Sequence, residues 1–440
     1  MPSRFLLTLS LLFPISARAQ TPLPVAAPAR LTAAASFVLD VDSMRVLSAK
    51  NPDVRMFPAS TTKIMTCLVA LERGNLNQVI RASKNAASTG ESGIYLLEGE
   101  NHTLRELVQA AMIHSANDAC VAIAEGVGGS QARFIGWMNQ KARELGCRNT
   151  RFVNPHGLHD PGHYTTAHDL AVISRAALKI PFMNEVAREK TATIGGNWKI
   201  GPTRLLINKN KLLFRWNATD GLKTGYTRQA GTCLVASATQ INPATGKPWR
   251  LLAVVLKSTP GQSFSDCQTL LQSAFNHYQP QIVARRGQIV RESNVKGGAF
   301  ALEATPARDV ALPLRAFERQ TLSPRVALFS LTAPIKKGQI VGQIEYFTRQ
   351  NGKSQRIAAT SLVARDVVPQ TLLARAIPPV GNRVSHFSLA ARILFLGLFC
   401  LGAASLLLFK RFHHVRRRSH SAFEAAKLPS RNSSRGGKRI

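Results

Sequence analysis

Apolar residues recur at helical spacing through much of the first 280 positions. Behind Thr103, which forms a capping box with Glu106, apolar positions fall at 104, 107, 108, 111 and 112. This pattern predicts a helix that begins at the capping box. Similar spacing and end signals predict further helices over 60–71, 117–125, 131–145, 167–178 and 263–278.

Strand-like runs lie on both sides of these helices. Residues 36–47 predict a hairpin with its turn near Asp42-Ser43, and residues 232–238 and 250–257 predict two further strands. Strands from both ends of the segment would then form one sheet beside the helices. The pattern predicts an α+β domain over 35–279, with a helical subdomain and an antiparallel sheet.

The next segment has a different pattern. Short β-like runs at 310–312 and 340–344, with turns at Lys337-Gly338 and Asn351-Gly352, predict a small all-β domain over 280–368. Proline-rich residues flank the two domains, so we expect a linker at 20–34 and a stalk at 369–388.

The two ends of the chain indicate export and anchoring. Residues 1–19 have a basic start, a short apolar run and an A-x-A site, which predicts a cleaved signal peptide. Residues 389–409 are apolar apart from Arg392 and reach about 31 Å as a helix, enough to cross a bilayer. The tail at 410–440 holds ten Lys or Arg and one acid. We therefore expect a single-pass protein of the inner (cytoplasmic) membrane, with the tail inside and both domains facing the periplasm or exterior.

Composition narrows the function classes. Hydrophobic residues make up 45% of the chain, which excludes general disorder. The net charge of +33 suits an anionic membrane or wall polymer, and nucleic acid is not expected because no nucleic-acid-binding signature is present. The six cysteines lack metal-site spacing, so we expect no metal and no cofactor. The sequence leaves one or two disulfides open, and most of the cysteines are expected to be buried small apolar residues.

Three short motifs occur in order along the first domain. They are Ser60-Thr61-Thr62-Lys63, Ser115-Ala116-Asn117 and Lys223-Thr224-Gly225. Patterns like the first two recur by chance at 293–296 and 83–85, so neither is specific alone. The ordered set of three is typical of class A β-lactamases and penicillin-binding proteins.

The first motif has the residues that covalent catalysis needs. Ser60 and Lys63 stand at i and i+3 near a predicted helix start, which places them side by side. A serine hydroxyl becomes a nucleophile only when a base takes its proton. An ordinary lysine needs roughly 5 kcal/mol to be neutral at pH 7, and burial or a second cation, here Lys223, lowers that requirement.

The other two motifs supply polar groups to the same cleft. Ser115 and Asn117 lie between helices, where they present a hydroxyl and an amide; the alternative is that either one merely caps the following helix. Lys223 and Thr224 suit a carboxylate, and Gly225 would let a substrate backbone lie close to the strand.

Residues 36–278 resemble the low-molecular-mass penicillin-binding proteins, the serine-type D-Ala-D-Ala carboxypeptidases. The resemblance includes segments 57–66, 154–158 and 163–171, and segment 333–339 resembles the family's C-terminal β-domain. It implies a β-lactamase/transpeptidase-like catalytic domain followed by a small all-β domain, to which this chain adds one C-terminal transmembrane helix.

The resemblance also implies roles for the motif residues. Ser60 would attack the carbonyl between two terminal D-alanines of a peptidoglycan pentapeptide, with Lys63 as base and Ser115 as proton donor to the leaving D-alanine. The acyl-enzyme would then be hydrolysed by water. Substrate binding would fall to Asn117, Lys223, Thr224 and Gly225, and the oxyanion hole to the backbone amides of Ser60 and Tyr226. Peptidoglycan stem peptides are the expected substrate partners and β-lactams the covalent inhibitors.

Some features keep other functions open. Many relatives carry an arginine before the closing helix to hold the substrate carboxylate, whereas this chain has Gly261-Gln262-Ser263-Phe264, so a D,D-endopeptidase is an alternative. A class A-like β-lactamase would need a deacylating carboxylate, and only Asp160 and Asp169 occur in 154–169. A non-catalytic wall-binding protein would have damaged motifs.

His156 and His163 are expected to be structural residues of a loop.

Overall fold

The computed structural model describes residues 30–371, apart from 196–201, 244 and 351–352. The predicted signal peptide, transmembrane helix and basic tail lie outside this part, as do the turn at Asn351-Gly352 and most of the linker and stalk. Within the described residues, every helix is too short or too polar to cross a membrane.

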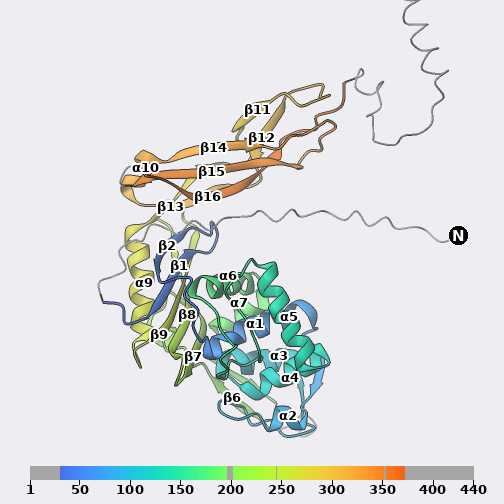
Figure 1. The fold of residues 1–440 in the computed structure, drawn as a ribbon, viewed down its shortest axis with the longest axis vertical. Helices are drawn as coiled ribbons and strands as arrows, with labels where there is room; N and C mark the ends of the chain where they lie inside the picture. Colours follow the sequence, from blue (N-terminus) through green and yellow to red (C-terminus); the bar gives the residue numbers. More distant parts are fainter. Residues whose placement is uncertain (1–29, 196–201, 244, 351–352, 372–440) are drawn as a thin grey trace, which may run out of the picture. The chain divides into compact units, whose positions relative to one another are not determined.

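A five-stranded antiparallel sheet forms the centre of the first domain (Figure 1). Its strands, in spatial order, are β2 (Val46–Lys50), β1 (Ala35–Asp40), β9 (Pro248–Ser258), β8 (Gly231–Ile241) and β7 (Thr219–Thr227). The β1–β2 hairpin thus pairs with β9, from the far end of the domain. This confirms the prediction that strands from both ends of the domain form one sheet.

Helix α9 (Ser263–His277) covers one face of this sheet. Its apolar positions recur at i, i+3 and i+4, and Cys267, Leu270 and Leu271 are fully buried against the strands. The opposite face carries the helical subdomain, in which α6 packs on β1 and β9 and α7 packs on β7 (Figure 1). The β-sheet is therefore the middle layer between two helical layers.

The helical subdomain is built around α4, which is buried along most of its length. Its small side chains, such as Ala119, Ala122 and Ala124, let α1, α3 and α5 pack closely against it. The longer helices of this subdomain are α1 (Lys63–Arg73), α3 (Leu104–Gln109), α4 (Asn117–Gly128), α5 (Gln131–Glu144), α6 (Ala167–Leu178) and α7 (Pro181–Arg188). The shorter elements are α2 (Lys84–Ala87), α8 (Leu212–Arg215) and the hairpins β3 (Val79–Arg81)–β4 (Asn101–Thr103) and β5 (Thr191–Ile194)–β6 (Arg204–Ile207).

The β-domain has its own apolar core, which includes Leu302, Leu312, Val341 and Tyr346. Its main sheet has the order β11 (Arg291–Ser293), β12 (Leu302–Pro306), β16 (Lys353–Ala364), β15 (Ile340–Gln350) and β14 (Ser323–Leu328). A second pair joins β10 (Gln279–Ala284) to β13 (Val310–Leu314), and α10 (Ala316–Thr321) precedes β14.

Most predicted elements are present with bounds shifted by a few residues. The helix predicted over 167–178 is α6, and the capping box of Thr103 and Glu106 forms as expected. The helix predicted over 60–71 instead begins with a 3₁₀ turn, η1 (Ala59–Thr62), before α1. The five described cysteines are all free and buried, in agreement with their expected role as small apolar residues.

Candidate active site

Ser60 lies in η1, where the chain turns sharply into α1. Ala59 adopts a positive φ of 48°, and the Thr61 amide donates to the Pro58 carbonyl at 3.2 Å, which closes the turn. The turn brings the Ser60 hydroxyl over the first residue of α1. As a result the Lys63 ammonium reaches the Ser60 Oγ at 2.9 Å, as the i, i+3 spacing predicted.

The Lys63 side chain is fully buried and has three oxygen acceptors. Besides Ser60 it donates to the Asn117 Oδ1 at 2.7 Å and to the His156 carbonyl at 2.7 Å, and none of these acceptors is a carboxylate. Burial lowers the pKa of Lys63 to about 8, and the charge of Lys209 acts in the same direction. Neutral Lys63 then requires only about 1 kcal/mol at pH 7, so it is suited to act as a base.

The second motif places Asn117 beside this lysine. A turn of π-helix, η2 (Ala110–His114), precedes it, and Ser115 ends that turn in the left-handed region with a φ of 69°. Neither Ser115 nor Asn117 caps α4 through its side chain, so the capping alternative is wrong. The Asn117 side chain instead bridges Lys63 and the Gly90 carbonyl, to which its Nδ2 donates at 3.0 Å.

The third motif lies in β7, which is the edge strand of the sheet. Lys223 is almost fully buried, and its pKa lies well below the ordinary value because of burial first and then the nearby charges of Lys63 and Lys209. The expected role of Gly225, which is to let a substrate backbone lie close to the strand, stays a prediction, and the structure shows a further role. A Cβ there would meet the Pro58 carbonyl oxygen and the Ser60 amide nitrogen, each at 3.0 Å. The glycine therefore lets β7 approach the turn that carries Ser60.

A pocket of about 270 Å³ opens above these residues. Its walls come from all three motifs and from the start of α9, and no Asp or Glu is among them. Thr232 on β8 pairs with Tyr226 on β7, and both side chains belong to the wall. The full lining is Ser60, Ser92, Ser115, Lys209, Thr224, Gly225, Tyr226, Thr232, Cys233, Ser263 and Phe264.

Several lining residues were not predicted as site residues, and the most polar pair among them is Ser92 and Lys209. The Lys209 ammonium donates to the Ser92 hydroxyl at 2.5 Å, and the Ser92 carbonyl accepts from the Asn117 amide at 2.6 Å. Lys209 is exposed and is the cation that the pocket lining includes among the described residues, whereas Lys223 is buried and lies outside the lining. Lys209 follows β6 in a segment without a recognisable motif, so only the tertiary structure brings it to the site.

The two histidines singled out by the sequence are structural, as expected. The His163 Nε2 lies 2.8 Å from the Thr62 hydroxyl, and its Nδ1 accepts from the Val153 amide at 3.2 Å. Burial lowers the pKa of His163 to about 4 and that of His156 to about 3. Both rings are therefore neutral at pH 7 and hold the loop that packs on η1. No cluster of potential metal ligands exists among the residues that the structure describes.

Comparison with known sequences decides the family. The D-alanyl-D-alanine carboxypeptidase family (peptidase S11) matches residues 22–259, and the C-terminal domain of penicillin-binding protein 5 matches residues 278–369. The chain belongs to the peptidase S11 family. Its members are serine hydrolases.

Relatives in this family match most of the chain. D-alanyl-D-alanine carboxypeptidase DacF of Bacillus subtilis (strain 168) is 35% identical over 323 residues, which cover 71% of this chain and 80% of that protein. DacC of Escherichia coli (strain K12) is 35% identical over 344 residues, which cover 73% and 81%.

Solved structures give the same result. Penicillin-binding protein 5 from Haemophilus influenzae superposes with a TM-score of 0.66 at 30% identity, over 78% of this chain and 99% of that one. D-alanyl-D-alanine carboxypeptidase DacD from Francisella tularensis superposes with a TM-score of 0.59 at 30% identity, over 80% and 98%. The catalytic domain and the following all-β domain therefore both have the fold predicted from the sequence.

Proposed function

We propose that this chain is a serine D-Ala-D-Ala carboxypeptidase that removes the terminal D-alanine from peptidoglycan pentapeptides through an acyl-enzyme on Ser60. The observation that carries the proposal is the contact of the Ser60 hydroxyl, at 2.9 Å, with a buried lysine whose pKa is about 8. The deprotonated Lys63 accepts the proton of Ser60 as its oxygen attacks the substrate carbonyl.

The remaining roles follow from where the polar groups lie. Ser115 lines the same pocket as Ser60, so its hydroxyl can pass a proton to the leaving D-alanine. Asn117 holds Lys63 at 2.7 Å and binds the substrate amide. The amides of Ser60 and Tyr226 form the oxyanion hole, in which each donor contributes roughly 3 kcal/mol.

The substrate carboxylate has no arginine before α9 to bind it. Thr224, Thr232 and Ser263 offer hydroxyls on the pocket wall, and Lys223 supplies positive charge from behind. Lys209, which also lines the pocket, supplies a second positive charge. These groups bind the terminal carboxylate of the substrate through several weaker contacts in place of one arginine. Without that arginine the preference for a free terminal carboxylate is weaker, so D,D-endopeptidase cleavage of crosslinked peptides is the second candidate function.

A β-lactamase activity is disfavoured by the absence of an acid on the pocket wall. Rapid deacylation needs a base that activates water. Asp169 accepts from the Asn149 amide and the Thr150 hydroxyl, each at 2.8 Å, and Asp160 accepts from the Gly162 amide at 2.7 Å. Both carboxylates thus stabilise the loop, and a penicilloyl group on Ser60 would persist. The intact motifs likewise disfavour a non-catalytic wall-binding protein.

One set of assays separates these functions. D-alanine release from a pentapeptide, cleavage of a crosslinked dimer and labelling by fluorescent penicillin are measured for the chain and for Ser60→Ala. The proposal predicts D-alanine release and stable labelling, both abolished in Ser60→Ala. Rapid turnover of penicillin would identify a β-lactamase, dimer cleavage without D-alanine release an endopeptidase, and absence of labelling a non-catalytic protein.

We further propose that the chain is a single-pass protein of the inner membrane, with the signal peptide at 1–19 removed and the segment 389–409 as the anchor. The uncharged run before the basic tail supports this topology. Protease treatment of intact spheroplasts tests it. The tail at 410–440 should be protected, and its digestion from outside would show that the topology is wrong.

A further inference from the structure

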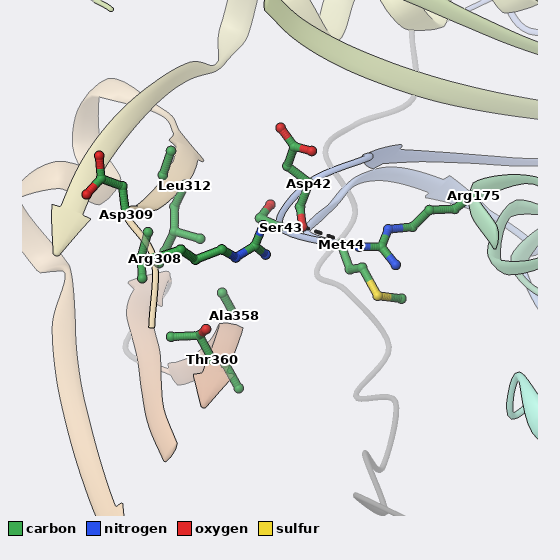
Figure 2. A pocket seen from close by; sticks show the side chains of 12 residues that line it. Asp42, Ser43, Met44, Arg175, Arg308, Asp309, Leu312, Ala358 and Thr360 are labelled. Carbon is green, nitrogen blue, oxygen red and sulfur yellow. Dashed lines mark hydrogen bonds between the residues drawn. The ribbon is translucent and has the colours of Figure 1, made fainter. Parts of the chain in front are cut away.

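A second cleft lies away from Ser60, next to the turn of the β1–β2 hairpin (Figure 2). Its volume is about 290 Å³. The turn residues 42–44 form one wall, and Arg175 of α6 lies beside them. The opposite wall comes from the β-domain, with Arg308 in the turn between β12 and β13 and residues 358–360 of β16.

Two guanidinium groups approach this turn from opposite sides. Arg175 is held in place because its Nε donates to the Val41 carbonyl at 2.5 Å and its Nη2 to the Asp42 carbonyl at 3.4 Å. Arg308 points toward Ser43 from the β-domain, while the carboxylates of Asp42 and Asp309 point away from the space between the two arginines (Figure 2). Within the described residues, neither arginine has an ion pair within 4.0 Å.

The positive charges in this cleft act on one another. The pKa of Arg175 is lowered, first by burial and also by the charge of Arg308, although Asp42 opposes the shift. The pKa of Lys179, one turn further along, is lowered first by Arg175 and also by Arg308. The Asp309 carboxylate accepts from the Arg286 amide at 2.9 Å, and no ion pair joins it to Arg175 or Arg308 among the described residues. Two arginines therefore line a cleft in which no described carboxylate pairs with them, and Lys179 adds positive charge nearby.

We propose that this cleft binds a phosphate ester, presented by an anionic phosphodiester polymer or by a lipid headgroup. Planar guanidinium groups bind phosphate oxygens in pairs, and a compact anion between Arg175 and Arg308 would relieve their mutual repulsion. The cleft is at the lower end of the size range of ligand pockets, which suits a headgroup better than a long chain. Bound phosphate would bridge the β1–β2 turn and the β12–β13 turn.

The test uses the full chain in neutral detergent and isothermal titration calorimetry with inorganic phosphate as the probe. Arg308→Gln removes a cation that makes no hydrogen bond with a described residue, so it should leave folding and penicillin labelling of Ser60 unchanged. Arg291→Gln, an exposed arginine on β11 of the same domain, is the matched control. We expect saturable binding that weakens at least tenfold in Arg308→Gln and less than twofold in Arg291→Gln.

Competition identifies the source of the phosphate. Displacement by a soluble glycerophosphate oligomer supports a polymer, and displacement by micelles that contain phosphatidylglycerol supports a lipid headgroup. Non-saturable binding, equal weakening in both variants, or phosphate binding that neither diester displaces would overturn the proposal. Because calorimetry does not depend on D-alanine release, these outcomes are separate from those that test the proposed activity.

Discussion

The contact between Asn117 and Lys63 allows a direct test of whether the pKa of Lys63 controls catalysis. The Asn117 Oδ1 accepts from the Lys63 ammonium at 2.7 Å in a buried site. Asn117→Asp keeps the size of the side chain but places a negative charge at that position. A carboxylate stabilises the charged form of the lysine, so the pKa of Lys63 must rise.

The size of the shift follows from the distance. Opposite charges 2.7 Å apart attract by about 6 kcal/mol at an effective dielectric constant of about 20. Desolvation of the new carboxylate offsets roughly half of this, which leaves about 3 kcal/mol, or about two pKa units. The pKa of Lys63 would therefore rise from about 8 to about 10, and the neutral fraction at pH 7 would fall about 100-fold.

The assay is the pH dependence of the second-order rate constant for acylation of Ser60 by penicillin. Below its pKa Lys63 is protonated, so the rate falls tenfold per pH unit on the acidic side. We expect this acidic limb near pH 8 in the unmodified chain and near pH 10 in Asn117→Asp. Asn117→Ala is the control, because it removes the amide without adding charge and should slow the reaction without raising the limb. An unmoved limb in Asn117→Asp would refute the assignment of Lys63 as the base.

Three further predictions concern the support of the site. Gly225→Ala should slow acylation of Ser60 at least tenfold, because the added Cβ would press on the backbone at Pro58 and Ser60. Gly136→Ala, whose added Cβ would have no atom within 4 Å, should leave the rate unchanged, and equal rates in the two variants would contradict this packing. Gly157→Ala should lower the free energy of unfolding by about 3 kcal/mol or more, because φ is 90° and the Cβ would lie 1.9 Å from the Ala59 carbonyl oxygen. Gly146→Ala is the control, because Gly146 has a φ of 81° but no atom within 4 Å of the added Cβ; its free energy of unfolding, measured by urea denaturation, should fall by only about 1 kcal/mol. Similar losses in Gly157→Ala and Gly146→Ala would contradict the close packing of the loop at Gly157. Burial lowers the pKa of His163 to about 4, so between about pH 6.5 and pH 4 the unfolded chain binds a proton that the folded chain does not. The free energy of unfolding should therefore fall as the pH is lowered through this range, and His163→Gln should make the fall less steep. The same pH dependence in both proteins would mean that His163 is not buried as a neutral ring.

The sequence was sufficient to predict what depends on local pattern. The i, i+3 spacing of Ser60 and Lys63 placed the two side chains together, and the capping box marked the start of α3. Helix α6 was predicted over its observed range because Thr166 caps it and its apolar positions repeat regularly. These features depend on a few neighbouring residues, which is why they are visible without the fold.

Other features depend on contacts between distant segments. Lys209 reaches the pocket only because the chain after β6 lies against η2, where the Lys209 amide donates to the Ile113 carbonyl at 3.3 Å. The packing role of Gly225 also depends on a distant contact, since the segment that needs the space is 165 positions earlier in the chain, at Ser60. The helix α7 was missed because it is short and its apolar face is defined by packing on β7.

The most direct test of the central claim is to locate the covalent adduct. After treatment with a β-lactam, the full chain is digested and the peptides are analysed by mass spectrometry. The account predicts one added β-lactam mass, on the peptide that contains Ser60, and none in Ser60→Ala. An adduct on any other side chain, or no adduct in the unmodified chain, would contradict covalent catalysis by Ser60.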